Sequence, residues 1–289
     1  MVRFVSFTAA GRSSYGIRVD GGVFDLGARF AAFAPDLKRY LAAVAHGLHP
    51  SVPGGAVDFS PGEFRLLPVI PNPSKILCVG LNYQDHRKET GRAEVPHPAL
   101  FTRFADSLTA HEDAIVLPPV SNALDYEGEL ALVIGKPAFR VPVERASEHV
   151  AGYACFNDGT LRDWQHHTHQ FTPGKNFPKT GALGPALVTP DEIGDFAGAA
   201  IETRLNGTVM QSAKLGDMIF SVAQIISYAS GFTRLEPGDV IATGTPGGVG
   251  FKRQPQVFMK AGDRIEVRIE GVGHLINTIA EEGIGDVRA

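Results

Sequence analysis

The chain has 289 residues and a net charge of −4, so it lacks the basic footprint of a nucleic-acid-binding protein. No apolar run approaches the roughly 18 residues of a membrane span. The N-terminus has neither the long apolar stretch nor the cleavage site of a signal peptide. We therefore expect a cytoplasmic protein that binds neither nucleic acid nor membrane. The two cysteines, Cys78 and Cys155, lie in apolar runs and are expected to be buried thiols, not a disulfide or a nucleophile.

Residues 1–72 are expected to form a small N-terminal α/β domain. Alternating apolar residues predict three short strands, at residues 2–7, 15–19 and 23–25. A Gly-Gly pair between the last two strands indicates a hairpin turn. Residues 36–45 have the spacing of an amphipathic helix. The proline-rich residues 68–73 are expected to be a linker.

Residues 73–289 are expected to form a larger domain that is mostly β, so the fold class is α+β. Strands are predicted at residues 76–79, 114–117, 127–134, 152–156, 200–205, 239–243 and 264–269. Helices are predicted at residues 84–90 and 222–230. The second helix opens with a capping box at Ser221 and ends at Gly231. Asn206-Gly207 predicts a hairpin turn.

Three carboxylates, Asp125, Glu127 and Glu129, alternate along one predicted strand. Side chains on a strand alternate between faces, so these three are expected to point the same way, roughly 6–7 Å apart. Like charges at that distance repel one another unless a cation lies between them. The pattern indicates a divalent metal site. The alternative is an exposed edge strand with a solvated acidic face, and the spacing leaves both open.

Asp158 follows the predicted strand at residues 152–156 and could turn toward the same face as Glu127 and Glu129. Three carboxylates with bound waters suit Mg²⁺ or Mn²⁺, because both ions prefer oxygen ligands. The alternative is that Asn157 and Asp158 cap the helix that follows. Spacing alone does not separate the two.

His86 and Glu89 stand three residues apart in a predicted helix, hence on one face. A glutamate can hold and polarise an imidazole, which gives a dyad able to activate water. Spacing alone favours an exposed helix with a chance pair.

Two turn-rich segments offer groups for an anionic substrate. Residues 172–177 contribute Lys175, and residues 242–250 contribute backbone amides and the Thr245 hydroxyl. The second segment lacks the Gly-Lys-Ser/Thr ending of a phosphate loop, so nucleotide binding is excluded. The histidines of residues 166–169 are irregularly spaced with no cysteine nearby, which favours a surface loop over a zinc site.

Taken together, these segments resemble the fumarylacetoacetate hydrolase family, in the family's order and over about residues 74–280. The matching pieces are Gly80-Leu-Asn-Tyr-x-x-His86, Asp125-Tyr-Glu-Gly-Glu-Leu-Ala131, Asn157-Asp-x-x-x-Arg-Asp-x-Gln165, Gly174-Lys-x-Phe177, Leu183-Gly-Pro185, Leu205-Asn-Gly207 and Leu235-Glu-Pro-Gly-Asp-Val-Ile-Ala-Thr-Gly-Thr-Pro246. The resemblance implies a catalytic domain built on a mixed β-sandwich roll, a small N-terminal domain and a homodimer.

The resemblance also implies roles for particular residues. Glu127, Glu129 and Asp158 match the family's metal ligands, for Mg²⁺ or Mn²⁺, whereas Asp125 matches none. Lys175 matches a lysine beside the metal that binds or polarises the substrate. His86 and Glu89 match the dyad of the acylpyruvate-hydrolase branch, in a segment that acts as a lid.

Four further residues are expected at the substrate: Tyr83, Arg103, Gln165 and Thr245. Gln165 and Thr245 match positions that line the pocket, and Tyr83 belongs to the first matching segment. Arg103 stands where the family usually has lysine. Its guanidinium can hold a carboxylate in two hydrogen bonds, so Arg103 is expected either to alter substrate choice or to serve only structure.

The implied activity is hydrolysis of a C–C bond in a β-diketo acid such as maleylpyruvate or fumarylpyruvate, which releases pyruvate and a carboxylic acid. The metal would chelate the keto acid end, His86 held by Glu89 would deprotonate a water, and Lys175 would help stabilise the departing enolate. The same site could decarboxylate oxaloacetate or isomerise 2-hydroxyhepta-2,4-diene-1,7-dioate. From another class, the chain could be a non-catalytic keto-acid-binding protein. The dyad favours hydrolysis.

Overall fold

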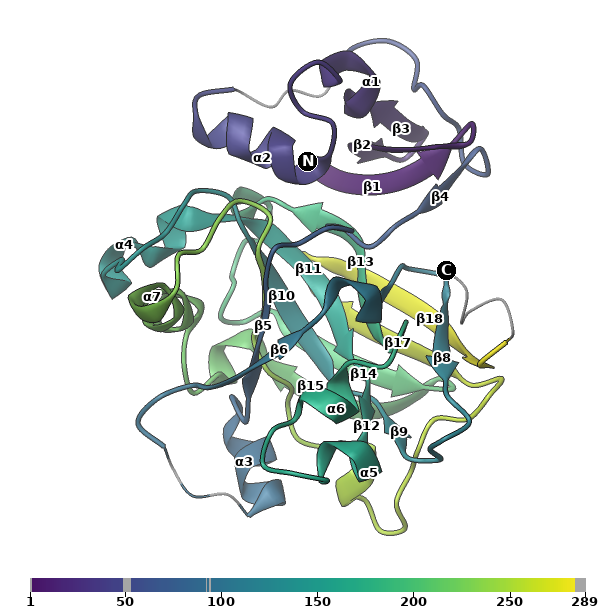
Figure 1. The fold of residues 1–289 in the computed structure, drawn as a ribbon, viewed down its shortest axis with the longest axis vertical. Coiled ribbons are helices and arrows are strands. Elements are labelled where there is room, and N and C mark those ends of the chain that lie inside the picture. Colours follow the sequence, from purple (N-terminus) through teal and green to yellow (C-terminus); the bar gives the residue numbers. More distant parts are fainter. Residues whose placement is uncertain (1, 49–52, 92, 94, 284–289) are drawn as a thin grey trace.

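The computed structural model describes residues 2–48, 53–91, 93 and 95–283. A small N-terminal lobe sits on a larger lobe built from two packed sheets (Figure 1). The helices are α1 (Leu26–Phe30), α2 (Leu37–Ala45), α3 (Gln84–Thr90), α4 (Val143–Ala146), α5 (Arg162–Gln165), α6 (Thr172–Lys175) and α7 (Val222–Phe232). Short 3₁₀ turns are η1 (Ala105–Ser107), η2 (Ser147–His149), η3 (Pro190–Glu192), η4 (Leu215–Asp217) and η5 (Gly250–Lys252). Within the described residues, no helix is long and apolar enough to cross a membrane.

The largest sheet has eleven strands, in the order β3-β2-β1-β13-β11-β10-β16-β5-β6, with β4 beside β1 and β7 beside β13. These strands are β1 (Arg3–Ala9), β2 (Arg12–Val19), β3 (Gly22–Asp25), β4 (Phe64–Leu66), β5 (Ile76–Gly80), β6 (Ala99–Arg103), β7 (Leu108–Thr109), β10 (Gly128–Ile134), β11 (Val150–Asp158), β13 (Gly181–Val188) and β16 (Val240–Ala242). Most pairs are antiparallel, but β16 runs parallel to β5 and β13 to β7, so the sheet is mixed.

A second sheet packs against the first and has the order β15-β14-β17-β18-β8. Its strands are β8 (Ala114–Leu117), β14 (Ala200–Leu205), β15 (Thr208–Lys214), β17 (Arg264–Ile269) and β18 (Gly273–Glu281). A third, two-stranded sheet pairs β9 (Leu124–Asp125) with β12 (Thr160–Leu161). The predicted β-rich sandwich with few helices is confirmed.

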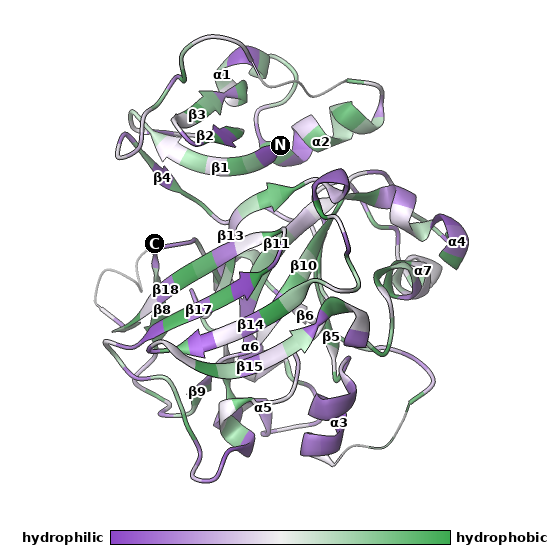
Figure 2. Ribbon diagram, turned by 180° about the vertical axis from the view of Figure 1, so that it is seen from behind, coloured by the Kyte–Doolittle hydropathy of each residue, from purple (hydrophilic) through white to green (hydrophobic). Residues whose placement is uncertain are grey.

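Strand β10 lies at the centre of the molecule and is buried on both faces. Leu130 and Leu132 belong to the core between the two sheets, whereas Ala131 and Val133 belong to the core on the other face. This explains why the sequence after Glu129 is a continuous apolar run instead of an alternating one. Figure 2 shows the contrast between such hydrophobic strands and the hydrophilic helix α3.

The N-terminal lobe continues the large sheet. Strand β1 pairs with β13 of the larger lobe, with Phe4 opposite Leu187. Phe4 and Tyr15 also share one core cluster with Phe156 and Leu187. The sheet and one core cluster therefore continue across the boundary expected near residue 72, and the division into two domains stays a prediction.

Local signals predicted several elements closely. Helix α3 covers the predicted residues, and the turn at Asn206 and Gly207 has positive φ at both positions, as a tight hairpin requires. Both cysteines are buried and free, as expected. Helix α7 runs one residue past Gly231, which lacks the positive φ of a helix-ending glycine, so that predicted end is wrong.

The shared core predicts that the two lobes unfold together. Replacing the buried Phe4 by alanine is expected to lower the free energy of unfolding by about 3–5 kcal/mol. The single tryptophan, Trp164, reports on the larger lobe, so its fluorescence midpoint in denaturant should fall with the mutation. Phe33→Ala, at an exposed ring in the same lobe, is the control. An unchanged Trp164 midpoint in Phe4→Ala would show that the lobes unfold separately.

Candidate active site

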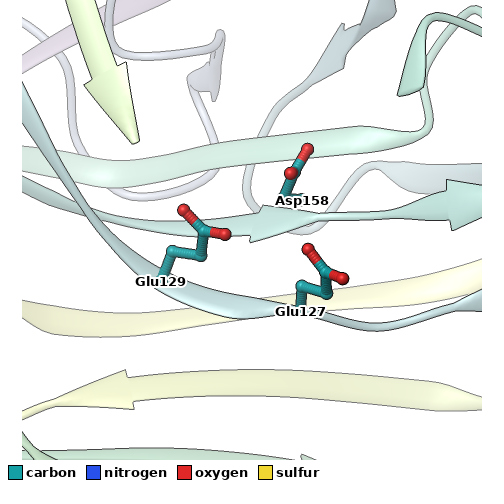
Figure 3. A group of neighbouring side chains, drawn as sticks. All are labelled: Glu127, Glu129 and Asp158. Carbon is teal, nitrogen blue, oxygen red and sulfur yellow. The ribbon is translucent and has the colours of Figure 1, made fainter. Parts of the chain in front are cut away.

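Strand register brings Glu127, Glu129 and Asp158 to one face of the large sheet. In the antiparallel pair of β10 and β11, Glu129 lies opposite Phe156. The amide of Asp158 donates to the carbonyl of Glu127 (2.8 Å), so these two residues also face each other. Because residues two apart share a face, all three carboxylates project to the same side. Figure 3 shows them converging, and one oxygen from each lies within 4.8 Å of the others. We call them the acidic triad.

Asp125 does not share this face, so the expectation from simple alternation is wrong. The chain leaves strand geometry at Tyr126 and Glu127, and Asp125 belongs to the separate β9–β12 pair. Its buried carboxylate accepts hydrogen bonds from the amides of Gly250 (2.8 Å) and Phe251 (2.9 Å). Asp125 therefore lies outside the ligand set, as the family resemblance implies.

Cations hold two members of the acidic triad. The Lys175 ammonium lies 2.8 Å from Glu127 Oε2 and 2.6 Å from Asp158 Oδ2. Arg162 Nη2 lies 2.6 Å from Glu127 Oε1. Glu129 has no ion pair among the described residues, and its Oε2 accepts a hydrogen bond from the Gly244 amide (2.8 Å). Within the described residues, the Glu129 carboxylate is thus stabilised by a backbone amide and not by a charged side chain.

These surroundings separate the pKa values of two neighbouring glutamates. Burial disfavours ionisation of Glu127, but Lys175 and Arg162 outweigh it and lower the pKa to about 2. Burial raises the pKa of Glu129 well above its usual value, and the charges of Asp158 and Glu127 raise it further. The two carboxyl groups therefore differ in how readily they ionise, and ionisation of Glu129 is the one that a cation beside it would favour.

The charge balance and donor set fit a divalent cation. Four buried carboxylates, those of Asp125 and the acidic triad, meet three buried cations, Arg103, Arg162 and Lys175. An excess negative charge out of contact with water is costly. Oxygen ligands that converge from two strands are the type that hard divalent cations take. The acidic triad would hold such an ion.

Lys175 ends the short helix α6 and is 1% exposed. Burial disfavours its ammonium form, but Asp158 and Glu127 outweigh this and raise its pKa, so the charge is kept. The ammonium also lies 5.1 Å from the centre of the Phe101 ring. Its predicted place beside the metal ligands agrees with the geometry.

The predicted dyad is present on α3. His86 Nδ1 lies 3.2 Å from Glu89 Oε2, and His86 is the one buried residue of the helix. Both oxygens of Glu89 also accept from the Gly248 amide at 3.2 Å. Glu89 therefore fastens α3 to the glycine-rich loop after β16 and holds the imidazole at the same time. The exposed-helix alternative is wrong for His86.

His86 and two triad members line one cavity of about 110 Å³. Much of its wall is apolar or aromatic, from Val79, Leu81, Phe101, Phe171, Val249 and Phe251. Gln165 and Thr245 line it as predicted. The Thr245 hydroxyl donates to the Gly128 carbonyl (3.0 Å) and accepts from Gln211 Nε2 (2.7 Å). His166 also borders the cavity, at its exposed side.

Two predicted substrate residues lie elsewhere. Arg103 does not line the cavity, because its guanidinium is buried on Asp158 (2.6 Å), the Gly159 carbonyl (3.0 Å) and the Thr180 hydroxyl (2.9 Å). It pairs with Asp158 of the acidic triad, and these contacts agree with the structural alternative. Tyr83 is buried and lines a neighbouring hollow with Asp217, so its predicted contact with the substrate stays a prediction.

Sequence reasoning gave no role to Arg162, which opens α5. Its Nε lies 2.8 Å from Asp125, its Nη1 donates to Gln165 (2.9 Å), and it also pairs with Glu127. The available signal was its place in the segment from Asn157 to Gln165. An arginine in a short polar helix is usually exposed, so the sequence gives no sign that Arg162 is buried, and only the fold shows it.

The chain matches the family model described as fumarylacetoacetate (FAA) hydrolase C-terminal over residues 75–280. It is 38% identical over 272 residues to the mitochondrial oxaloacetate tautomerase FAHD2A of Bos taurus, which covers 90% of this chain and 84% of that protein. It is 44% identical over 229 residues to the oxaloacetate tautomerase YisK of Bacillus subtilis (strain 168), which covers 78% and 76%. The chain belongs to the fumarylacetoacetate hydrolase family.

Solved structures agree on the fold. A fumarylacetoacetate hydrolase from Exiguobacterium antarcticum is 36% identical with a TM-score of 0.84, over 98% of this chain and all (100%) of that one. A maleylpyruvate hydrolase from Sphingobium sp. SYK-6 is 26% identical with a TM-score of 0.77, over 97% and 100%. The similar proteins thus carry the names of tautomerases, hydrolases and isomerases, the last including a 2-hydroxyhepta-2,4-diene-1,7-dioate isomerase from Mycobacterium marinum.

The acidic triad predicts a pH-dependent gain in stability from Mg²⁺. Because folding raises the pKa of Glu129, the metal-free protein gains stability as pH falls through that raised pKa and loses it as pH rises. Mg²⁺ needs the ionised carboxylate, so its stabilisation, about 2.7 kcal/mol at roughly a hundred times Kd, should be full above this pKa and shrink below it. Thermal unfolding with and without Mg²⁺ across pH measures this.

A matched pair of variants gives the control for this measurement. Glu129→Gln should lose the Mg²⁺ gain and its pH dependence, whereas Glu144→Gln, at an exposed carboxylate on α4, should keep both. A Mg²⁺ gain in Glu129→Gln equal to that of the wild type would place the ion elsewhere.

Proposed function

We propose that this chain is a divalent-metal-dependent tautomerase that interconverts the keto and enol forms of oxaloacetate, with Mg²⁺ or Mn²⁺ held by the acidic triad. The observation that carries the proposal is that triad carboxylates and the His86 imidazole line one cavity. The relatives from Bos taurus and Bacillus subtilis are both named oxaloacetate tautomerases. For these reasons we rank tautomerisation ahead of the acylpyruvate hydrolysis expected from the sequence.

When bound, the divalent cation supplies a Lewis acid for the carboxylate and keto oxygens of a 2-keto acid, which makes the adjacent C–H group more acidic. The chain's own contribution is to move the proton. Glu89 accepts only, so a neutral His86 donates its Nδ1–H there and keeps a lone pair on Nε2. Nε2 takes a proton from C3, and the imidazolium returns one to the keto oxygen. The C3–H and C2=O bonds thereby become C2=C3 and O–H.

Fixed cations support this step. Lys175 and Arg162 both have raised pKa values despite burial, because the charges of neighbouring carboxylates outweigh the cost of desolvation. Both side chains therefore stay charged while negative charge develops on the substrate oxygen. Apolar walls limit water at the reacting carbon. Tautomerisation needs no water, whereas hydrolysis does.

Cavity size also favours a small acid. The volume of about 110 Å³ is well below the roughly 300–1,000 Å³ of sites for drug-sized ligands. A four-carbon keto acid suits it better than a longer acylpyruvate does.

The homodimer implied by the family resemblance stays a prediction.

Hydrolysis of a β-diketo acid is the second candidate, because the contact between His86 and Glu89 could equally activate a water. The similar structure from Sphingobium is named a maleylpyruvate hydrolase. Decarboxylation of oxaloacetate would need the metal ion and no base. Product analysis separates these: tautomerisation releases no pyruvate, hydrolysis of fumarylpyruvate yields pyruvate and fumarate, and decarboxylation yields pyruvate and CO₂. A non-catalytic keto-acid-binding protein would give no turnover.

Removing the base should stop tautomerisation and leave the metal centre intact. His86→Ala is expected to lower kcat for ketonisation of enol-oxaloacetate by about 10²–10⁴-fold, followed as loss of enol absorbance above the uncatalysed rate. Its Mg²⁺-dependent gain in thermal stability should match the wild type. His46→Ala, at an exposed imidazole of the N-terminal lobe, is the control. A fully active His86→Ala enzyme would overturn the assignment of the base.

A further inference from the structure

Lys252 is a lysine that lines the cavity. It ends the 3₁₀ turn η5, lines the cavity and is half-buried. Its ammonium lies 5.2 Å from the centre of the Phe251 ring. Among the described residues, no acidic side chain forms an ion pair with it. A lysine that lines the cavity beside an aromatic ring and has no such ion pair is available for an anion.

The other lysine and arginine side chains of the cavity are already engaged. Lys175 pairs with Glu127 and Asp158. Arg162 pairs with Asp125 and Glu127. Both are buried at the metal-ligating end, whereas Lys252 is partly open to solvent. Within the described part of the chain, the lysine and arginine side chains inside the cavity are therefore paired with carboxylates, whereas Lys252, toward the exposed side, is not.

Counting charges shows what the unpaired cation can do. The four carboxylates and three cations of the buried centre leave one negative charge, which a divalent ion would convert into one positive charge. That positive charge balances a single substrate carboxylate. A second carboxylate on the substrate would be uncompensated inside the cavity unless a further cation met it. Lys252 is the side chain in place to do so.

The backbone that carries Lys252 is fixed to the metal-ligating end. Asp125 accepts the amides of Gly250 and Phe251 and also binds Arg162 Nε (2.8 Å). A Cβ on Gly250 would meet the Val257 carbonyl oxygen at 1.8 Å and Asp125 Oδ1 at 2.6 Å, so this turn requires glycine. The Asp125 carboxylate thus binds both the turn and the buried Arg162, and it thereby fixes the position of the backbone next to Lys252.

We infer that Lys252 binds the distal carboxylate of the substrate and makes the site selective for 2-keto dicarboxylates over 2-keto monocarboxylates. This rests on the proposed function only in that a keto acid binds at the acidic triad. Lys252 is a specificity residue, since it acts on the end of the substrate that does not react.

The test compares two ligands that differ only at the distal end. Oxaloacetate carries a carboxylate where 2-oxobutanoate carries a methyl group. Competition binding to the Mg²⁺-loaded protein, measured at low temperature, should favour oxaloacetate in the wild type. Lys252→Gln should weaken oxaloacetate about tenfold and leave 2-oxobutanoate unchanged. In turnover, KM for oxaloacetate should rise by a similar factor with kcat within about twofold.

Two further variants complete the test. Lys252→Arg should restore most of the preference, and Lys260→Gln, at an exposed lysine of the same segment, should leave it intact. Equal affinity of Lys252→Gln and wild type for oxaloacetate would overturn the inference, as would an equal loss for both ligands. Because binding is measured directly, a wild type that prefers oxaloacetate without tautomerising it would refute the proposed function and leave the role of Lys252 standing.

Discussion

The repulsion among buried carboxylates is the constraint on which the rest of the site depends. Strand pairing brings Glu127, Glu129 and Asp158 onto one face of the large sheet, where all three are buried. Lys175 and Arg162 compensate Glu127 so well that its pKa falls to about 2, while the pKa of Glu129 rises. The imbalance makes the centre receptive to a divalent cation. The same repulsion explains the buried arginine and lysine side chains around the acidic triad, because each of them offsets part of its negative charge.

Supporting residues convert this charge balance into a defined cavity. The Arg103 guanidinium donates a hydrogen bond to Asp158. The Asp125 carboxylate accepts hydrogen bonds from both Arg162 and the backbone amide of Phe251. On the opposite side, Glu89 fastens α3 to the glycine-rich loop and orients His86. The proposed base, the acidic triad and the cavity wall are therefore held by hydrogen bonds and ion pairs, which is how a site keeps its geometry before the substrate arrives.

Local patterns in the sequence predicted what depends on neighbouring residues. Alternation placed Glu127 and Glu129 on one face, and a polar stretch predicted α3, because both follow from backbone periodicity. Pairing between distant segments was not predictable in this way: the strand β13 was missed, and so was its pairing with β1. The contacts of Arg103 were not predictable for the same reason, since its partners Asp158 and Thr180 lie more than fifty residues away. Family resemblance supplied Asp158 and Lys175, which spacing alone left open.

The central claim is that the acidic triad holds a divalent cation with which this chain tautomerises oxaloacetate. The most direct measurement is titration of Mn²⁺ into metal-stripped protein, with bound metal and the rate of enol-oxaloacetate ketonisation followed in the same samples. The account predicts negligible catalysis without metal and a rate that rises in proportion to occupancy, reaching its plateau at one ion per chain. Full activity in the stripped protein, or occupancy without any gain in rate, would contradict it.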